Sequence, residues 1–518
     1  MILSHAARHQ ALPASGPKRE ALRQKGQFWT PDWVAEAMVA YAVGGGQDSI
    51  FDPCVGEGAF FRAAKAISVQ THRHIALTGT ELHAEALRQA KVSGLSDEDL
   101  AAVETRDFVL NPPKGPIPAI VANPPYIRHH RLSAEVKDQL RSLAQRLIGA
   151  PLDGRAGLHV YFLLRALQLL APEGRLAFIM PADTAEGVFS GDLWHWITAH
   201  YCLDAVVTFA PEASPFPGVD TNPIVFLIRN SRSRSKFLWA RCKAPQSPSL
   251  RTWVQHGFAA QTDPSLEVCS RSVAEALSTG FSRVPMMHKN EGPVLSDFAK
   301  VMRGIAAGAN DFFFLTRLQA DALSLPEKFL LPALGRTRDV QGDEITKATL
   351  QAAVDAGRPT LLFAPDGRPI EEFPASVQRY LRQGESMGLP QRALISQRHP
   401  WYKMEVRAIP PFLFAYLGRR SARFIRNFGG IVPLTSFLCV YPINRNPEFI
   451  ERLWRVLRDP ETVANLPLVG KSYGAGAIKV EPRALERLPL PLSVVARENL
   501  QSVPSGSQLE LALQFSVA

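Results

Sequence analysis

The chain has 518 residues, of which 46% are hydrophobic and 20% charged; this excludes a disordered or fibrous protein and predicts two globular domains or slightly more. The formal net charge of +10 favours binding to a polyanion such as nucleic acid or an acidic membrane surface. The five cysteines lie far apart and form no C-x-x-C pair, which argues against a zinc ribbon and a disulfide scaffold.

Two features bear on where the protein works. The first residues lack the pattern of a signal peptide, and the longest apolar run, residues 158–171, contains Arg165 and is too short to span a membrane. We therefore expect a cytoplasmic protein that does not use a membrane.

The sequence predicts alternating strands and helices up to residue 229, after a flexible polar arm of residues 1–24. Helical patterns cover residues 31–43, 58–67, 83–92, 133–147, 158–171 and 189–200. Strand patterns cover residues 48–52, 74–81, 101–106, 118–122, 175–180, 204–209 and 223–229. This alternation is typical of a Rossmann-like α/β domain with a seven-stranded, mostly parallel sheet, whose ligands bind at the carboxyl ends of the strands.

The alternation ends at the Ser- and Arg-rich stretch 229–243, so we predict domains of residues 25–240 and 241–500 and a tail of residues 501–518. The second domain shows short mixed elements and no repeat, and we expect a mixed α/β fold. Residues 1–230 carry 21 Lys and Arg against 23 Asp and Glu, whereas residues 231–518 carry 37 against 25. The basic excess suits a domain that contacts a phosphate backbone, although a merely soluble basic domain would show it too.

Three successive strand ends carry residues suited to a ligand that contains adenosine. The first strand leads into DPCVGEG, where Gly56 and Gly58 let the chain turn close to a ligand at a helix N-terminus. The second strand ends in Glu81, whose carboxylate can accept ribose hydroxyls. After the third, Asp107 can accept from an exocyclic amine and Phe108 can stack on adenine. The glycine pair alone would also fit a structural turn.

The fourth strand ends in Asn123-Pro124-Pro125-Tyr126, which suits methylation of an amino group on a planar ring. Such a nitrogen is a poor nucleophile because its lone pair is delocalised into the ring. If the Asn123 amide oxygen and the Pro124 carbonyl accept its hydrogens, the lone pair becomes available, and the prolines keep both acceptors rigid. Tyr126 offers a face for the ring to stack on. Taken alone, these residues could also form a Pro-Pro turn after a strand.

In this order, the motifs resemble the gamma-group adenine-N6 DNA methyltransferases of bacterial restriction–modification systems. The resemblance includes KGQFWTPDWVAEAM (25–38), residues 157–183 and SPFPGVDTNPIVFLI (214–228). It implies a class I methyltransferase domain that binds S-adenosylmethionine through Thr30, Pro31, Asp52, Cys54, Gly56 and Pro125, beside Gly58, Glu81, Asp107 and Phe108. It also implies catalytic Asn123, Pro124 and Tyr126, and a contact of Phe216 with a flipped base, although a core phenylalanine fits the spacing nearly as well.

The resemblance continues in VMRGIAAGANDFFFL (301–315) and KSYGAGAIKVEPRALERLPLPL (471–492), which resemble parts of the family's C-terminal target-recognition domain. Residues 240–290 and 340–390 match only loosely, so no recognition sequence is implied. The family implies methylation of adenine N6 in double-stranded DNA, which protects the host from a separately encoded restriction endonuclease. We expect a monomer.

Residues 398–430 interleave basic and aromatic residues around a single acidic residue, Glu405. We predict that this segment contacts DNA through Arg398, Lys403, Arg407, Arg419, Arg420, Arg423 and Arg426. The alternative is a solvated basic helix beside a core. His129 and His130 have no companions at metal-ligand spacing, and we expect no metal site.

Three rival functions stay open at this point. Methyltransferases acting on guanine in RNA or on a protein glutamine share the Asn-Pro-Pro-Tyr motif, but they typically lack a long C-terminal domain. A restriction enzyme with its own nuclease would need a nuclease centre, whereas the E-x-K triplet Glu135-Val136-Lys137 lies in a helical pattern. An inactive sequence-recognition subunit would have no use for the complete set of motifs.

Overall fold

In the computed structural model, the described residues are 28–187, 189–216, 219, 222–245, 248–259, 263–283, 285, 292–405, 407–415, 422–473 and 477–501, excepting the side chains of 211, 467, 471–473 and 477–479. The predicted arm, and the predicted tail beyond residue 501, lie outside these ranges. The chain divides into two compact units, called unit 1 (Met1–Pro285 with Ser472–Gly476) and unit 2 (Met286–Lys471 with Ala477–Ala518).

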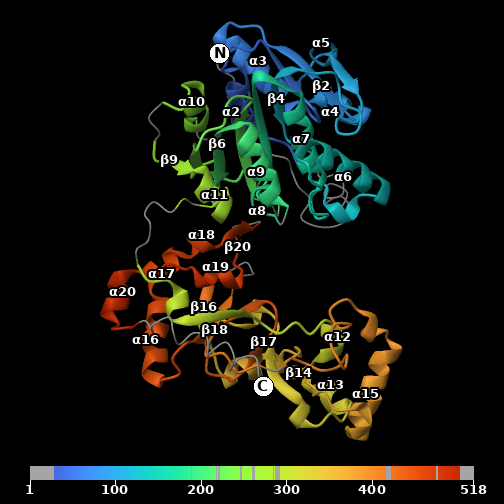
Figure 1. The fold of residues 1–518 in the computed structure, drawn as a ribbon, viewed down its shortest axis with the longest axis vertical. Coiled ribbons are helices and arrows are strands. Elements are labelled where there is room, and N and C mark those ends of the chain that lie inside the picture. Colours follow the sequence, from blue (N-terminus) through green and yellow to red (C-terminus); the bar gives the residue numbers. More distant parts are fainter. Residues whose placement is uncertain are drawn as a thin grey trace. The chain divides into compact units, whose positions relative to one another are not determined.

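Unit 1, which contains the N-terminal part of the chain (Figure 1), is built on a nine-stranded sheet. The strand order is β3-β2-β1-β4-β5-β7-β6-β8-β9. Its strands are β1 (Ser49–Asp52), β2 (Ala76–Glu81), β3 (Val103–Thr105), β4 (Ile117–Ala122), β5 (Leu170–Pro181), β6 (Cys202–Phe209), β7 (Pro223–Arg229), β8 (Lys236–Cys242) and β9 (Leu266–Ser272). The pairs β2/β3, β1/β2, β1/β4 and β4/β5 are parallel, while β7 runs antiparallel to both β5 and β6. The predicted α/β fold is confirmed, and its first seven strands lie close to their predicted ranges.

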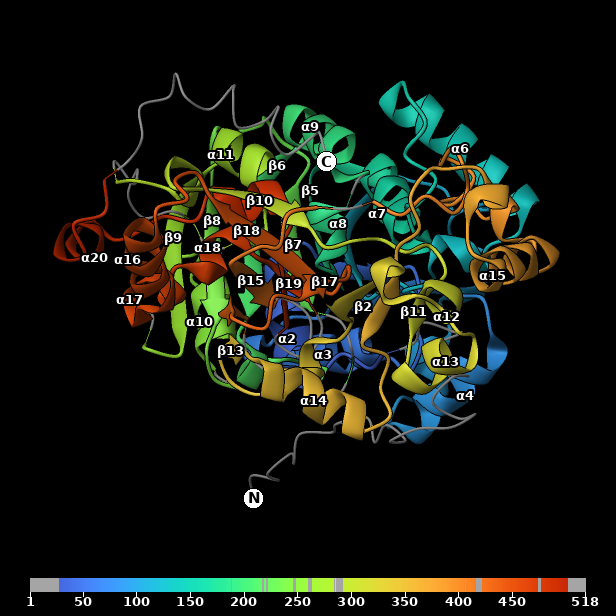
Figure 2. The same ribbon diagram turned by 90° about the horizontal axis from the view of Figure 1, so that it is seen from below.

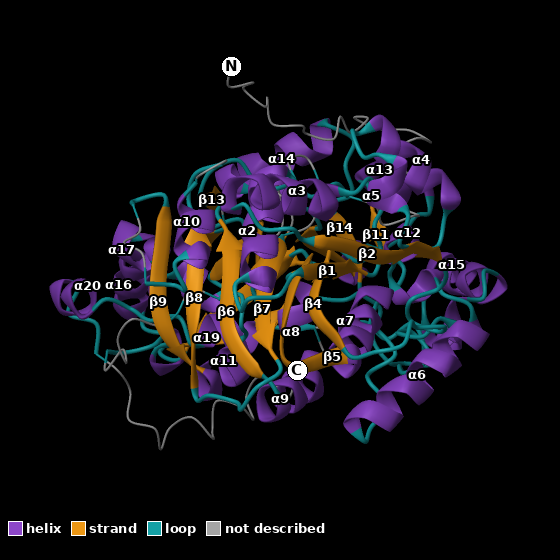
Figure 3. Ribbon diagram, turned by 90° about the horizontal axis from the view of Figure 1, so that it is seen from above, coloured by secondary structure: helices purple, strands orange, loops and turns teal. Residues whose placement is uncertain are grey.

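Helices cover both faces of this sheet (Figure 3). They are α2 (Asp32–Val43), α3 (Ala59–Thr71), α4 (Ala84–Val92), α5 (Asp97–Leu100), α6 (Ala134–Ile148), α7 (Leu158–Leu169), α8 (Asp183–Glu186), α9 (Ser190–His200), α10 (Ser249–Gln255) and α11 (Val273–Thr279). One hydrophobic core joins α2, α3 and α10 to one face, and a second joins α6, α7 and α9 to the other. Strands buried on both faces explain the nearly continuous apolar runs in β4, in residues 176–181 of β5 and in β7.

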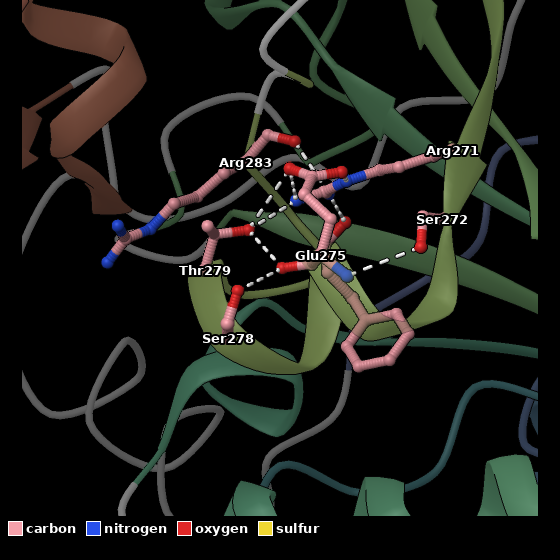
Figure 4. Close-up of polar contacts among 7 residues, drawn as sticks. Arg271, Ser272, Glu275, Ser278, Thr279 and Arg283 are labelled. Atoms are coloured by element: carbon pink, nitrogen blue, oxygen red, sulfur yellow. Dashed lines mark hydrogen bonds and ion pairs between the residues drawn. The ribbon is translucent and has the colours of Figure 1, made fainter. Parts of the chain in front are cut away.

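Strands β8 and β9 extend the sheet beyond the predicted boundary near residue 240, and unit 1 ends at Pro285. The Ser/Arg-rich stretch before β8 is therefore a turn within unit 1 and not an exit from it. The end of unit 1 is fixed by Arg271 of β9, which is 2% exposed. Its guanidinium donates to the Glu275 carboxylate at 2.9 and 3.0 Å and to the carbonyls of Phe281 and Arg283 at 3.1 and 2.9 Å (Figure 4).

Unit 2 contains a five-stranded sheet in the order β10-β18-β15-β16-β13 and a four-stranded sheet in the order β11-β14-β12-β17 (Figure 2). Their strands are β10 (Ala299–Arg303), β11 (Phe314–Leu315), β12 (Leu330–Leu334), β13 (Glu344–Ile345), β14 (Leu361–Phe363), β15 (Phe412–Ala415), β16 (Arg423–Asn427), β17 (Val432–Pro433) and β18 (Phe437–Pro442). A two-stranded sheet of β19 (Lys471–Tyr473) and β20 (Ala477–Lys479) follows.

The helices of the second half are short. They are α12 (Asn310–Phe313), α13 (Arg317–Ala322), α14 (Lys347–Asp355), α15 (Ala375–Ser386), α16 (Pro447–Arg458), α17 (Pro460–Ala464), α18 (Leu466–Val469), α19 (Pro482–Glu486) and α20 (Leu492–Arg497). Helix α16 packs on the five-stranded sheet, where the ring of Trp454 stacks on Phe412 with centroids 5.7 Å apart. The predicted mixed α/β fold of this half is confirmed. Within the ranges described, no helix combines the length and the apolar character needed to cross a membrane.

Candidate active site

The candidate site lies at the carboxyl ends of the neighbouring parallel strands β2, β1, β4 and β5. These strands deliver Glu81, Asp52, Asn123 and Asp183 to one edge of the sheet. The predicted residues from different strand ends are thus brought together by the strand order.

The loop between β1 and α3 is tied to the end of β2 by the carboxylate of Glu81. Its Oε2 accepts from the backbone N–H of Gly56 at 2.9 Å, and its Oε1 accepts from that of His83 at 3.0 Å. Gly58 has a φ of 76°, and a Cβ there would lie 2.2 Å from Leu95 Cδ1, so a residue with a side chain would fit poorly. The loop is thus held in one conformation at the N-terminus of α3, where backbone N–H groups can donate to an anionic or hydroxyl-rich ligand.

Asp52 is buried beside this loop, with 1% of its surface exposed. Its Oδ1 accepts from the N–H of Cys54 at 3.0 Å, whereas its Oδ2 is buried and has no hydrogen-bond partner among the described residues. Burial raises the pKa of Asp52 to about 8; the Cys54 N–H opposes this shift and the neighbouring Glu81 adds to it. A buried carboxyl group with a vacant oxygen is suited to a cationic ligand.

Asp107 and Phe108 lie beyond the end of β3, but they differ in orientation. Asp107 Oδ1 accepts from the backbone N–H groups of Val109 and Leu110 at 2.8 and 2.9 Å. Phe108 is 1% exposed, and its ring packs against Phe51 and Phe162 in the core. In this structure neither face of the Phe108 ring is open for the predicted stacking on an adenine ring, because the ring is packed into the core beside the sheet.

The side-chain amide of Asn123 is oriented by two acceptors on the segment before α2. Its Nδ2 donates to the backbone carbonyl of Phe28 at 2.6 Å and to Oγ1 of Thr30 at 3.1 Å. A carbonyl oxygen can only accept, so the amide must present its NH₂ group to Phe28 and its oxygen to the opposite side. This oxygen, Oδ1, is buried and has no hydrogen-bond partner among the described residues. An amino group is the kind of ligand that would satisfy it.

The prolines that follow Asn123 hold the strand end rigid. Pro124 is buried, and the carbonyl of Pro125 accepts from the N–H of Ile127 at 2.9 Å. Tyr126 donates its hydroxyl to the carbonyl of Ile179 on β5 at 3.3 Å, which holds the end of the side chain at this strand. Burial raises the pKa of Tyr126 well above 10, with further upward contributions from Asp183 and Cys54, so the phenol stays protonated.

Sequence reasoning missed two residues that contact Tyr126. The ring of Phe28 lies 5.7 Å from that of Tyr126 and 6.0 Å from that of Phe216, between centroids. Phe216 is itself 4% exposed, and it joins Tyr126 in one aromatic cluster through Phe28. His159 of α7 meets Tyr126 edge to face, with centroids 5.9 Å apart. Phe28 could have been identified from the sequence as the aromatic residue two positions before Thr30.

His159 is also unusual in its hydrogen bonding. The residue is 4% exposed, and neither ring nitrogen has a hydrogen-bond partner among the described residues. Its Nε2 lies 3.8 Å from Oδ1 of the mostly exposed Asp183. Burial lowers the pKa of His159 from 6.5, and Asp183 opposes that shift.

No group of three or more His, Cys, Asp or Glu side chains within the described ranges is placed to hold a metal ion. His129 and His130 lie in a short 3-10 helix, His129–Arg131, with their rings 5.4 Å apart.

The arginines of residues 398–430 that were predicted to contact DNA have different partners within the fold. Arg426 is 9% exposed, pairs with Glu451, and lies over the rings of Phe412 and Phe428. Arg398 donates to the carbonyl of Ala306 at 2.5 Å and lies over the ring of Phe313.

Arg407 pairs with Glu405 and donates to the carbonyl of Arg303. Arg423 donates to the carbonyls of Gly342 and Val340 at 3.1 and 3.0 Å. In this structure these guanidinium groups join segments of unit 2, and their contact with DNA stays a prediction. Lys403 is exposed, and Arg419 and Arg420 lie outside the described residues.

Comparison with known proteins finds a similar family for each half of the chain. Residues 18–243 match the N-6 DNA Methylase family, and residues 284–510 match the C-terminal domain of Type II methyltransferase M.Eco57I. The chain is 24% identical over 476 residues to Type II methyltransferase M.AccI of Acinetobacter calcoaceticus, covering 89% of this chain and 84% of the relative. It is 25% identical to Type II methyltransferase M.XamI of Xanthomonas campestris pv. amaranthicola, covering 93% and 88%.

Among solved structures, the Type IIL restriction-modification enzyme MmeI in complex with DNA has a similar fold, with a TM-score of 0.50. The match covers 96% of this chain and 75% of that chain at 11% sequence identity.

Proposed function

The chain belongs to the adenine-N6 DNA methyltransferases of restriction–modification systems, and from this premise we propose how its strand-end site performs the reaction. The site at the ends of β1, β2 and β4 binds S-adenosylmethionine and a flipped adenine side by side. The observation that carries the proposal is the buried, unpartnered Oδ1 of Asn123, whose amide is held in one orientation by Phe28 and Thr30.

The residues around Asp52 fit the cofactor. Asp52 offers a buried carboxyl oxygen that lacks a partner among the described residues, and Glu81 lies one strand away with lone pairs suited to ribose hydroxyls. When bound, S-adenosylmethionine supplies an electrophilic methyl group on a sulfonium centre. The residues that would hold it are Thr30, Pro31, Asp52, Cys54, Gly56, Gly58, Glu81, Asp107 and Pro125.

The residues after β4 would activate the target nitrogen. Oδ1 of Asn123 accepts one hydrogen of the adenine amino group, and the carbonyl of Pro124 accepts the other. Both acceptors draw the nitrogen toward tetrahedral geometry, so its lone pair is directed at the methyl carbon. Because the Asn123 amide and the two prolines are fixed before the substrate arrives, little reorganisation accompanies the transfer. The nitrogen–carbon bond would form as the bond between the methyl carbon and sulfur breaks, and the amino proton would then pass to solvent, because the nitrogen has become acidic.

An adenine inside a duplex cannot reach this site, so the base must be flipped out. Flipping costs a few kcal/mol of unstacking, and we propose that stacking on Tyr126 and Phe216 offsets part of it. Phe216 is 4% exposed, so the base would bind at the edge of the aromatic cluster or displace part of it.

We propose that the C-terminal half provides the remaining grip on double-stranded DNA. Residues 286–518 carry 29 Lys and Arg against 22 Asp and Glu, which is most of the basic excess of the chain, and a basic surface binds phosphates with an affinity that falls as salt rises. We further propose that the protein acts as a monomer in the cytoplasm and protects host DNA from a separately encoded restriction endonuclease.

The experiment that tests this function uses labelled S-adenosylmethionine and the purified chain. Duplex DNA of mixed sequence, ribosomal RNA and a protein extract are incubated in parallel, with the Asn123→Ala variant beside the wild type. We expect label in DNA, recovered as N6-methyladenine, and its loss in the variant. Label in RNA or protein would contradict the proposed substrate. Cofactor binding without any transfer would instead indicate an inactive recognition subunit.

A further inference from the structure

Phe28 contacts the transfer site through both its backbone and its side chain. The carbonyl of Phe28 accepts from Asn123 Nδ2 at 2.6 Å, which is the shorter of the two hydrogen bonds that orient this amide. The ring of Phe28 lies 5.7 Å from Tyr126 and 6.0 Å from Phe216, tilted by 49° and 39°. One residue therefore connects the acceptor of the target amine with the two rings proposed to hold the base.

The tilted geometry distinguishes this cluster from a simple stack. Neither the ring of Tyr126 nor that of Phe216 lies parallel to the ring of Phe28 at stacking distance. The three rings are therefore tilted toward one another, and Phe28 stacks face to face with neither of the other two. Phe28 is half-buried, in contrast to Phe216 with 4% exposure, so its side chain is the more accessible of the two. A flat heterocycle that enters beside Tyr126 would meet the ring of Phe28.

The segment of Phe28 leads directly into α2, whose N-cap is Pro31 and has no side-chain cap. The amide of Asn123 bonds this segment at Phe28 and Thr30, and the segment in turn orients the amide.

We propose that Phe28 is a base-contacting residue of the methyltransferase: its ring forms the third wall of the pocket for the flipped adenine, and its carbonyl fixes the acceptor Asn123. This inference rests on the proposed function of the site. It assigns to the segment before Thr30 a contact with the target base in addition to its implied contact with the cofactor.

The test compares Phe28→Leu, Phe28→Tyr and the wild type. Leucine keeps the bulk and the backbone carbonyl but has no aromatic face, whereas tyrosine keeps the face. The adenine methylated by the wild type is mapped first and then replaced by 2-aminopurine in a duplex, whose fluorescence rises when that base leaves the stack. Methylation of the unmodified duplex, S-adenosylmethionine affinity and thermal unfolding are measured for each protein.

Base–aromatic stacking predicts that Phe28→Leu raises the KM for DNA about 5- to 100-fold and reduces the fluorescence rise, while Phe28→Tyr, which keeps the aromatic face, is impaired less than Phe28→Leu. Cofactor affinity should be unchanged in both variants, and both should remain folded at the assay temperature. If Phe28→Leu showed the same fluorescence rise and the same methylation as the wild type, the inference would be overturned. A loss of S-adenosylmethionine binding that accounts for the whole methylation defect of Phe28→Leu would overturn it too. The proposed function itself fails only if the wild type does not methylate DNA.

Discussion

Glu81 at the end of β2 accepts a hydrogen bond from the backbone N–H of Gly56 at 2.9 Å, so the ends of two adjacent strands are joined around the proposed cofactor site. The second carboxylate oxygen accepts from His83 at 3.0 Å. Both oxygens of one side chain therefore maintain the shape of the site, in addition to any contact with a ribose.

Replacing Glu81 with Gln should weaken cofactor binding. An amide has one oxygen and one NH₂ group, so one of the two backbone N–H groups would face a donor. We expect about a 10-fold loss of S-adenosylmethionine affinity, because hydrogen bonds to charged groups are stronger than neutral ones. Isothermal titration calorimetry measures this. Glu85→Gln is the matched control, since that carboxylate is largely exposed and pairs with Arg88; equal losses in both variants would contradict the assignment.

The raised pKa of Asp52, about 8, predicts that cofactor binding depends on pH. At neutral pH the group is mostly protonated, and a cationic ligand favours the carboxylate, so binding should release a proton. We expect the affinity for S-adenosylmethionine to rise between pH 6 and pH 8, with proton release visible as buffer-dependent heat. Asp52→Asn should bind more weakly and lose the proton release attributed to this residue; unchanged proton release in the variant would contradict this role.

The same shift has a consequence for stability. The pKa of Asp52 in the folded state lies above its ordinary value of 3.8. Its carboxyl group therefore contributes most to the free energy of unfolding below pH 4, and this stabilisation is lost as the pH rises toward 8. The free energy of unfolding of Asp52→Asn, relative to the wild type, should therefore increase across this window.

Lys403 and Arg426 come from the same basic segment but should differ when replaced by Gln. Lys403 is exposed, and if it contacts a phosphate, its loss should make the slope of log affinity against log salt less negative by about 0.9. Arg426 pairs with Glu451 and lies over two aromatic rings, so its loss should lower the free energy of unfolding by about 1–3 kcal/mol. Salt-dependent DNA binding and urea unfolding separate the two. A large change of salt slope in Arg426→Gln alone would contradict the structural role of that residue.

Arg271→Met should destabilise unit 1. The buried guanidinium bonds the Glu275 carboxylate and the carbonyls of Phe281 and Arg283, which would lose these donors. We expect a loss of about 2–4 kcal/mol in the free energy of unfolding, measured with urea. Arg88→Met serves as the control because Arg88 forms an exposed pair. If both variants unfold at the same urea concentration, Arg271 does not hold the end of unit 1.

The sequence predicted the placement of residues correctly where a residue pattern is compatible with only one arrangement of strands. Apolar strands ending in Asp52, Glu81 and Asn123 had to place these residues at one edge of a parallel sheet, and the structure does so. The same reasoning could not show that Asn123 bonds Phe28, because 95 residues separate the two. Only the path of the segment before α2 brings them together.

Composition was misleading where a residue type serves two purposes. The Ser/Arg-rich stretch before β8 had the composition of a linker, yet it is a turn that leads into two more strands of the sheet. Arg423 and Arg426 had the spacing of a DNA-binding face, yet their guanidinium groups meet carbonyls, a carboxylate and aromatic rings. Charge patterns do not reveal whether a cation faces solvent or a partner within the fold.

The central claim is that Oδ1 of Asn123 accepts a hydrogen from the adenine amine and thereby activates it. The most direct measurement is the single-turnover rate of N6-methyladenine formation at saturating cofactor and DNA, in the wild type and in Asn123→Ala. We predict that the rate falls about 100- to 1,000-fold while the affinities for DNA and S-adenosylmethionine change little. A wild-type rate in the variant, or a defect removed by higher concentrations of either ligand, would contradict the claim.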